Sequence, residues 1–237
     1  MSFLSAEWRK LVMANYVVDP KVLLPYLPAG TTLDVWNGKC YLSLVGFLFK
    51  ETRLKGIKVP FHVNFEEVNL RFYVVRKTES EERRGVVFIQ EIVAKPALSL
   101  VANVVFRENY VTRRMQHSLQ VSPNGIQVQY AWKTKNKWNK MEVLAAPYSA
   151  EITPGSEVEF ITEHYWGYAK KNTHKTNEYE VTHPRWVHYP VQESTIDVDF
   201  GMTYGDHFAF LNTEQPVSIF LAEGSEITVE PKKTLPS

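Results

Sequence analysis

The sequence predicts an α+β fold, mainly β, that forms a single domain over residues 1–237. Strand-like runs rich in β-branched and aromatic residues dominate the chain, and turn sequences separate them. Helical signals are confined to three segments. The chain contains no repeat, no low-complexity tract and no linker rich in Pro, Gly or Ser. Because β-rich domains commonly reach this length, we expect one domain.

The first predicted hairpin joins residues 31–36 to residues 39–49. Both runs are strand-like, and Asn37 and Gly38 stand between them. Asn-Gly between two such runs is the strongest short-range hairpin signal. We therefore expect a tight turn at this dipeptide.

A second hairpin is expected around the charged loop 76–85. This loop follows the segment FEEVNLRFYVV at 65–75 and precedes the strand-like run 86–94. Every second residue of the first strand is apolar, so one of its faces is predicted to be buried. Further strands are expected at 117–121, 126–132, 208–213, 217–224 and 225–231.

The three predicted helices begin at recognisable capping sequences. Asp19 is placed as the N-cap of the first helix, with Pro20 at its first position. Apolar residues at helical spacing predict a second helix over about 96–105. Ser156, with Glu159 three residues later, forms a capping box for a third helix that is expected to run through FITEHYWGY.

The composition narrows the class of protein. Hydrophobic content of 44% and charged content of 22% are typical of a globular protein. The net charge of +1 gives no reason to expect a nucleic-acid partner, and the four lysines around Trp138 are interpreted as a solvated hairpin tip. Cys40 is the only cysteine. No apolar run approaches 18 residues and no signal peptide is evident, so we expect a cytoplasmic protein without a membrane partner.

The second face of the strand at 65–75 carries the first candidate site. Glu67, Asn69, Arg71 and Tyr73 alternate there with the apolar residues. Successive side chains on one face are roughly 6.6 Å apart, so a small ligand can contact two or three of them. Three interpretations stay open at this point: a solvated face, a buried ion pair, or the lining of a pocket.

Further candidates lie in FITEHYWGY and in HPRWVHYPV. Glu163, His164 and His183 carry donor atoms that suit zinc or iron(II), but no HExxH-type spacing accompanies them, and we predict no metal site. Hydrogen-bonded packing is the favoured interpretation for the group. A surface of aromatic side chains at Tyr165–Tyr168 is an alternative, as the interface of a homo-oligomer.

Motifs of nucleotide-dependent and serine-nucleophile chemistry are missing. Neither G-x-x-x-x-G-K-[ST] nor G-x-G-x-x-G occurs, and there is no G-x-S-x-G. We therefore predict no cofactor. A Ser/His/Asp triad stays open, because the chain has seven histidines.

Several long segments together resemble the YqjF-like family of uncharacterised bacterial proteins. They are WRKLVMANYVVDPKVLLPYLPAGTTLD, FEEVNLRFYV, GVVFIQEIV, FITEHYWGY and HPRWVHYPV, which follow the family's order from about Trp8 to about Leu221. The family is grouped with the acetoacetate decarboxylase-like superfamily. The resemblance implies a strongly bent antiparallel sheet, partly closed into a barrel, with a few covering helices and a central pocket.

The same resemblance implies which residues face that pocket. In the decarboxylases a lysine forms a Schiff base with a β-keto acid, and a glutamate helps to position the substrate. Glu67 lies in the strand that matches the one carrying this glutamate, and Asn69 and Arg71 would face inward with it. Arg107 and Tyr110 stand where the reactive lysine is expected and would complete a polar pocket floor, with Glu163 and His164 as further ligand-binding candidates.

The segment around Tyr110 departs from the decarboxylase pattern. No lysine occurs between Pro96 and Trp132. An arginine stays protonated and a tyrosine cannot form an imine, so neither replaces the nucleophile. Lys39 and Lys95 remain as substitutes, but neither lies in a decarboxylase-like motif. Schiff-base decarboxylation is therefore not expected.

Three functional hypotheses follow. The first is a protein whose central polar pocket binds a small organic acid or carbonyl compound, an anion because two guanidiniums would face one carboxylate. The second is a lyase- or hydrolase-type enzyme without a covalent lysine, in which Glu67 or His183 is the general base. The third is a non-catalytic, homo-oligomeric interaction protein.

Overall fold

The computed structural model describes residues 2–96 and 109–235. Its helical segments are α1 (Pro20–Leu23), η1 (Leu24–Tyr26), α3 (Glu157–Thr162), α4 (Phe200–Tyr204) and η2 (Asp206–Asn212), where η marks a 3₁₀ helix. Its strands are β1 (Leu4–Val18), β2 (Thr32–Leu33), β3 (Val35–Trp36), β4 (Lys39–Leu54), β5 (Phe65–Lys77), β6 (Glu82–Val93), β7 (Tyr110–Thr112), β8 (Met115–Ser122), β9 (Gly125–Thr134), β10 (Lys137–Ala145), β11 (Ala150–Glu151), β12 (Trp166–Asn172), β13 (Lys175–Thr182), β14 (Val187–Tyr189), β15 (Val191–Asp197), β16 (Ser218–Val229) and β17 (Lys233–Leu235). The predicted helix at 96–105 lies almost entirely outside the described residues.

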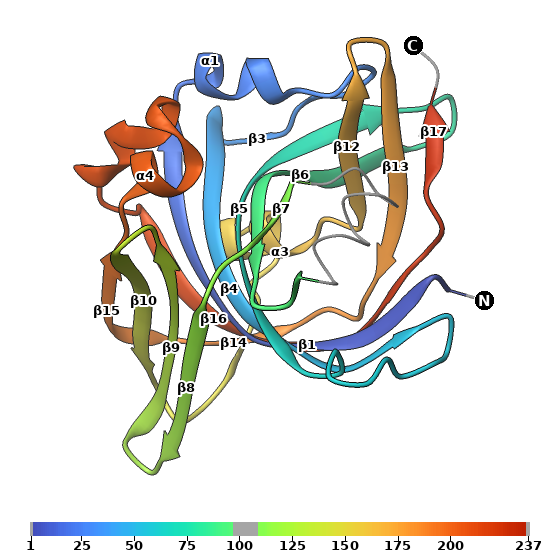
Figure 1. Cartoon of the computed structure of the whole chain (residues 1–237). Coiled ribbons are helices and arrows are strands. Elements are labelled where there is room, and N and C mark those ends of the chain that lie inside the picture. The colour runs from blue at the N-terminus through green and yellow to red at the C-terminus, as the bar shows by residue number, and fades with distance from the viewer. Residues whose placement is uncertain (1, 97–108, 236–237) are drawn as a thin grey trace.

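The larger sheet is strongly curved, and seven of its strands close into a ring (Figure 1). The strand order is β16-β1-β4-β5-β6-β12-β13, and β13 pairs with β16 to close the ring. Neighbouring strands in the ring are antiparallel except for β6 and β12. The mainly β class and the strongly bent sheet predicted from the sequence are confirmed.

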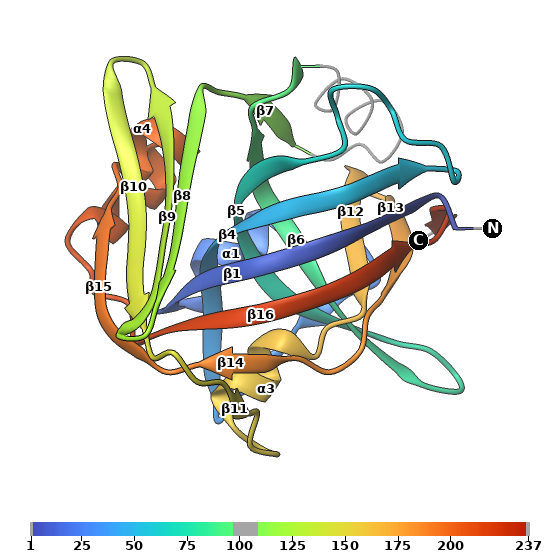
Figure 2. The same ribbon diagram turned by 90° about the horizontal axis from the view of Figure 1, so that it is seen from below.

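A second sheet, in the order β15-β10-β9-β8, stands beside the curved sheet (Figure 2). Val128 and Val143 of this sheet share a hydrophobic core with Val68 and Phe72 of β5. We call this the outer core. A separate inner core, which includes Tyr73, lies on the other face of the curved sheet. The strand β5 is therefore buried on both faces.

The predicted turn sequences determine where the strands end. Asn37 and Gly38 have φ angles of 50° and 75° and join β3 to β4. The turn at 122–125 joins β8 to β9, which include the strands expected at 117–121 and 126–132. The β5–β6 connection is shorter than the predicted loop, because both strands extend into its charged residues and pair as far as Lys77 and Glu82.

The cap of the first helix is confirmed. The Asp19 carboxylate accepts a hydrogen bond from the Lys21 amide at 2.8 Å, and Pro20 begins the helix. The predicted strand at 208–213 is wrong, because residues 208–212 belong to η2 and Thr213 caps it. Phe208 and Leu211, three residues apart, both pack into the outer core, which is the spacing of a 3₁₀ helix.

The third helix begins as predicted but ends early. Ser156 Oγ accepts a hydrogen bond from the Glu159 amide at 3.2 Å. The expected continuation through FITEHYWGY is wrong, since β12 already begins at Trp166 and lies between β6 and β13. Tyr168 is fully buried in the outer core. The segment Tyr165–Tyr168 is therefore not the exposed aromatic surface that the homo-oligomer hypothesis requires.

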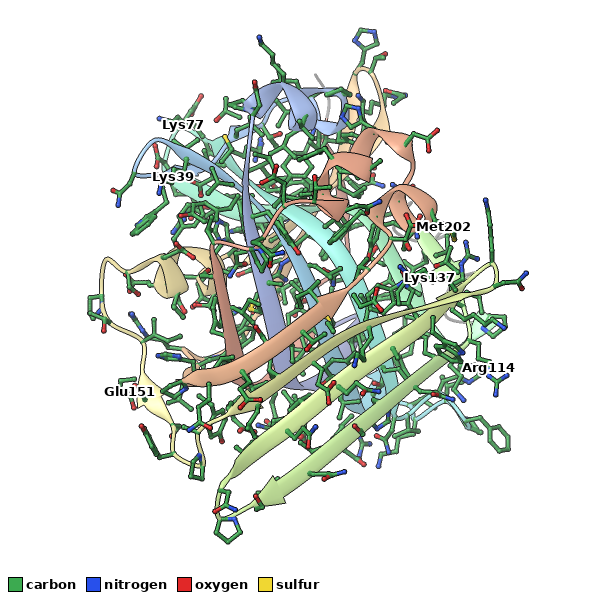
Figure 3. All side chains as sticks on the ribbon, turned by 90° about the vertical axis from the view of Figure 1, so that its left-hand side faces the viewer. Lys39, Lys77, Arg114, Lys137, Glu151 and Met202 are labelled. Carbon is green, nitrogen blue, oxygen red and sulfur yellow. The ribbon has the colours of Figure 1, made fainter. Side chains whose placement is uncertain are left out.

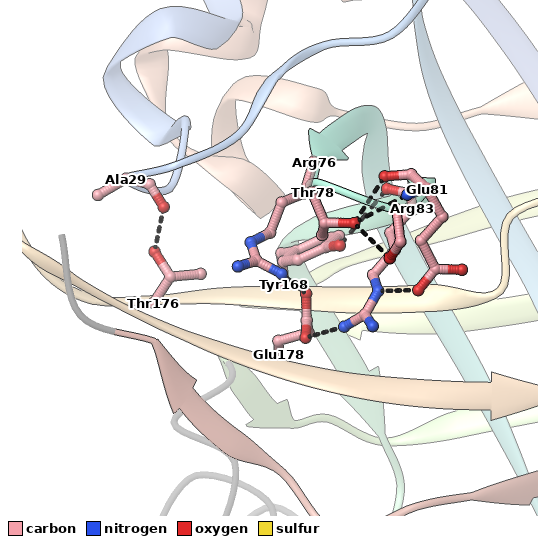
Figure 4. Close-up of polar contacts among 9 residues, drawn as sticks. Ala29, Arg76, Thr78, Glu81, Arg83, Tyr168, Thr176 and Glu178 are labelled. Atoms are coloured by element: carbon pink, nitrogen blue, oxygen red, sulfur yellow. Dashed lines mark hydrogen bonds and ion pairs between the residues drawn. The ribbon is translucent and has the colours of Figure 1, made fainter.

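A buried carboxylate connects the β5–β6 hairpin to β13. The Glu178 side chain is 1% exposed and accepts hydrogen bonds from Arg76 Nη1 at 3.1 Å and Arg83 Nη1 at 2.8 Å (Figure 4). On the same strand, Thr176 Oγ1 donates to the carbonyl of Ala29 at 2.8 Å. These bonds stabilise the part of the ring that contains β6 and β12, its only parallel pair.

In the described part of the chain, no helix is long and apolar enough to cross a membrane. The assignment of residues 1–237 to one domain stays a prediction.

Candidate functional site

A cavity of about 220 Å³ lies within the ring, and every ring strand contributes to its wall. Most of the lining side chains are apolar or aromatic: Phe3, Leu4, Trp8, Leu11, Phe47, Phe49, Leu54, Val59, Phe65, Val86, Phe88, Trp166, Val181 and Val229. The polar or polar-tipped members are Thr52, His62, Glu67, Asn69, Arg71, Glu91, Tyr110, His164 and Tyr179. The expected polar pocket is therefore an apolar cavity that contains a group of polar side chains.

The polar face of β5 contributes three residues to this wall. Glu67, Asn69 and Arg71 are 2%, 1% and 7% exposed, so this face is not solvated. Tyr73, the fourth member of the row, is buried beside the cavity, and its hydroxyl donates to Ser43 Oγ at 2.7 Å. The period-two pattern thus identified the side of β5 that faces the cavity.

Glu67 is held by two neutral hydrogen-bond donors. Asn69 Nδ2 donates to Glu67 Oε1 at 3.0 Å, and the Tyr110 hydroxyl donates to Oε2 at 3.2 Å. Burial raises the pKa of Glu67 to about 7, against the opposing influence of these bonds and of the Arg71 charge. Both protonation states of Glu67 are therefore populated near neutral pH.

Glu91 is a second carboxyl group in the wall. It lies on β6 directly opposite Asn69, is 2% exposed and lines the cavity. Burial and the charges of Glu67 and Glu91 raise the pKa of Tyr110 well above its usual value, so its hydroxyl keeps its proton. Glu91 was not among the predicted site residues, although a glutamate within the apolar run VVFIQEIV indicates a buried polar group.

Arg71 is a buried cation without a counter-ion among the described residues. Its side chain forms no ion pair or hydrogen bond within residues 2–96 and 109–235, and its buried Nε has no acceptor there. The guanidinium carbon lies 5.8 Å from the centre of the Tyr73 ring. The interpretation of Glu67 and Arg71 as a direct ion pair is therefore wrong. The second predicted guanidinium, Arg107, lies outside the described residues.

His164 lies in the wall with one nitrogen bonded and the other free. His164 Nε2 is 3.1 Å from Asp34 Oδ2, which also accepts a hydrogen bond from Arg84 Nε at 2.7 Å. The side chain of His164 is 1% exposed, and its Nδ1 has no partner in the described structure. Burial lowers the pKa of His164 to about 4, so the imidazole is neutral. Asp34 and Arg84 were not selected from the sequence.

Two predicted site residues lie away from the cavity wall. Glu163 accepts a hydrogen bond from the Tyr165 hydroxyl at 2.6 Å and faces a separate open pocket. His183 stacks on Trp186 at 4.3 Å between ring centres, with its Nδ1 2.9 Å from the Pro184 carbonyl oxygen. Burial lowers the pKa of His183. The structure does not bring either residue together with Glu67.

The described residues do not form a cluster of metal-binding side chains. No three side chains of His, Cys, Asp or Glu lie close enough there to hold an ion. Glu163, His164 and His183 are accordingly not gathered into a site.

No lysine lines the cavity among the described residues. Lys39 is exposed at the periphery of the molecule (Figure 3). Lys95 is partly exposed. The segment 97–108 contains no lysine either. The described lining therefore offers no amine that could form a Schiff base.

Fold and cavity together define a mainly β protein whose curved sheet surrounds a largely apolar cavity. The chain matches, over residues 5–226, the family DUF2071, which is described as an uncharacterized conserved protein. The chain belongs to this family.

Three known proteins show how far the similarity extends. The uncharacterized protein YqjF of Bacillus subtilis (strain 168) is 26% identical over 216 residues, which are 89% of this chain and 84% of YqjF. The enduracididine biosynthesis enzyme MppR, solved with the condensation product of pyruvate and imidazole 4-carboxaldehyde, has a TM-score of 0.69 at 13% identity, over 100% of this chain and 90% of that one. An acetoacetate decarboxylase-like enzyme from Sphingomonas wittichii RW1 has a TM-score of 0.67 at 12% identity, over 100% of this chain and 94% of that enzyme. The two solved structures establish the acetoacetate decarboxylase-like fold.

Proposed function

We propose that the cavity binds a small organic acid, with the carboxylate at Arg71 and an apolar body against the aromatic walls. The observation that carries this proposal is the buried Arg71 guanidinium, which has no counter-ion within the described residues. Removing a cation from water is costly unless an anion or acceptors replace the water. A carboxylate is the anion that matches a planar guanidinium best, because it can accept two parallel hydrogen bonds.

The cavity limits the size of the ligand. Its volume of about 220 Å³ lies below the roughly 300 Å³ at which typical ligand pockets begin. An apolar cavity of about 150 Å³ accommodates benzene. The ligand that fits best is therefore an acid with a short hydrocarbon body, whose burial adds about 25 cal/mol per Å² of apolar surface.

The protonation of Glu67 supports an anionic ligand. When Glu67 is neutral, it does not repel a ligand carboxylate and does not compete with that carboxylate for Arg71. The relative MppR, which was solved with a compound derived from pyruvate, supports an acid that also carries a carbonyl group. Glu91 adds a second carboxyl group to the lining, so the ligand is expected to approach Arg71 rather than the β6 side of the wall.

The test is a thermal-shift comparison of matched short-chain compounds. Butanoate, hexanoate and 2-oxobutyrate are expected to raise the melting temperature at millimolar concentration, whereas 1-butanol and 1-hexanol raise it less. Arg71→Met is expected to abolish the difference between acids and alcohols. Arg114→Met, which changes an exposed arginine at the periphery of the molecule, is the matched control (Figure 3). Equal shifts with acids and alcohols, or no shift with any acid, would refute the proposal.

The remaining hypotheses stay predictions. Glu67 lines the cavity and is available as an acid or base, whereas His183 does not line it. The homo-oligomer hypothesis has no exposed aromatic surface at Tyr168 to support it.

A further inference from the structure

His164 and Asp34 form a buried pair at the cavity wall that ligand binding alone does not require. We infer that this pair is a proton acceptor that removes a proton from the carbon next to the carbonyl group of a 2-oxo acid bound at Arg71. The inference rests on the proposed function, because it needs the acid to be bound. It extends that function from binding to the reversible formation of an enolate.

The contact with Asp34 fixes the tautomer of His164. The hydrogen bonds from His164 and Arg84 lower the pKa of Asp34 despite its burial, so its carboxylate is ionised. An ionised carboxylate 3.1 Å from Nε2 can only accept, which places the imidazole proton on Nε2. Nδ1 therefore carries a free lone pair, which is the state that a base requires.

The Nδ1 atom of His164 is buried and has no hydrogen-bond donor within the described structure, while His164 lines the cavity. Buried polar atoms in proteins nearly always have a partner, so an unpaired one requires an explanation. His188 Nδ1 is unpaired in the same way, so an unpaired nitrogen alone does not identify a base. His164 differs from His188 because it lies in the cavity wall, where a bound substrate can supply the missing partner.

His164 and Arg71 contact the same aromatic ring. Both side chains lie beside the ring of Tyr73, with the imidazole centre 4.7 Å and the guanidinium carbon 5.8 Å from the ring centre. The Arg71 charge also opposes protonation of His164. A bound carboxylate neutralises that charge, so the ligand itself makes His164 a better proton acceptor.

The proposed step balances without any further reactant. The C3–H bond of the 2-oxo acid breaks, and the proton forms an N–H bond at His164 Nδ1. The electron pair of the broken bond forms the C2–C3 double bond, and the carbonyl pair moves to oxygen, where Arg71 stabilises the charge. Asp34 stabilises the imidazolium as a positioning residue, and return of the proton restores the acid.

The experiment follows the C3 protons of 2-oxobutyrate by NMR in D2O, with the purified full-length protein. We expect exchange for deuterium to exceed the buffer rate. His164→Gln is expected to reduce the enzymatic exchange rate about 100-fold or more, which is the usual contribution of a general base. Its thermal shift with 2-oxobutyrate should persist. Asp34→Asn should lower the exchange rate at least tenfold at saturating 2-oxobutyrate, again without loss of the shift.

His188→Gln is the matched control, because His188 also has a buried, unpartnered Nδ1 but does not line the cavity. Its exchange rate should equal that of the parent. A parent protein that shows the thermal shift without exchange, or a His164→Gln variant that exchanges at the parent rate, would overturn this inference and leave the proposed function standing. Absence of any thermal shift in the parent would overturn both.

Discussion

At the residue scale, the role of Arg71 depends on its burial without a counter-ion among the described residues. A site that is preorganised for an anion keeps a largely buried, unpaired guanidinium in the empty protein, and this arrangement lowers stability. Functional sites commonly carry such a cost. The consequence can be measured without knowing the ligand.

We predict that Arg71→Met raises the free energy of unfolding by about 1–3 kcal/mol in the absence of ligand. Methionine has a similar length and needs no counter-ion, and replacing buried charges by apolar groups is often stabilising by this amount. Urea denaturation measures the change. Arg114→Met, at an exposed position, should differ from the parent by less than about 0.5 kcal/mol. A loss of stability on Arg71→Met would show that the guanidinium is paired after all.

A second prediction concerns the pH dependence that Glu67 confers. Its pKa of about 7 in the folded protein lies above the usual 4.5, so the folded state binds more protons than the unfolded state between these values. Stability therefore falls as the pH rises from about 4.5 to about 7, by up to about 3 kcal/mol, and then levels off.

Glu67→Gln removes this titration. We expect the free energy of unfolding of the variant, relative to that of the parent, to be higher at pH 8 than at pH 5. Urea denaturation at both pH values measures this difference. The exposed Glu180→Gln should show no such gain. An equal difference between Glu67→Gln and the parent at the two pH values would contradict the assignment of a raised pKa to Glu67.

At the element scale, the cavity depends on a close approach of β12 and β13. A Cβ atom built on Gly167 would lie 2.1 Å from Cζ of Tyr179, and Tyr179 lines the cavity. Gly167→Ala therefore forces the tyrosine ring or the strand to move. We predict a loss of about 1–3 kcal/mol in the free energy of unfolding and a weaker thermal shift with hexanoate. Parent-like values for both would mean that β12 can move away at little cost.

The connection between the β5–β6 hairpin and β13 gives a further prediction. Glu178 is buried and bonded to two arginines that are 24–26% exposed. We expect Glu178→Gln to lower the free energy of unfolding by about 1.5–3 kcal/mol, the usual value of a hydrogen bond to a charged group. Glu180→Gln, two residues farther along the same strand but at an exposed position, serves as the control in the same urea titration. Equal stability of the two variants would refute a structural role for Glu178.

The elements also show what the sequence could reveal. Alternation along β5 identified Glu67, Asn69 and Arg71 as one face, because period two is a local property of a strand. The sequence did not identify three other residues at the cavity or bonded to its lining: Asp34, Arg84 and Glu91. Their positions depend on strand register and on the packing of α3, which are set by contacts between distant segments.

At the scale of the whole molecule, the curved sheet has apolar cores on both sides. This arrangement explains why β5 carries apolar residues on one face and a polar group on the other, while neither face is exposed. A sequence pattern distinguishes the two faces of a strand, but it does not show whether the polar face is exposed to solvent or lines a cavity. The resemblance to a family supplied that distinction here, and it also led us to expect a more polar pocket than the one observed.

Calorimetric titration of the parent and Arg71→Met with hexanoate at pH 6.5 measures whether Arg71 binds the carboxylate of an acid in the cavity. We expect measurable binding to the parent and an affinity at least tenfold lower for the variant, because a carboxylate without its guanidinium would be desolvated unpaired. Equal affinities would show that Arg71 does not hold the acid. No binding to the parent would contradict the assignment of the cavity to organic acids.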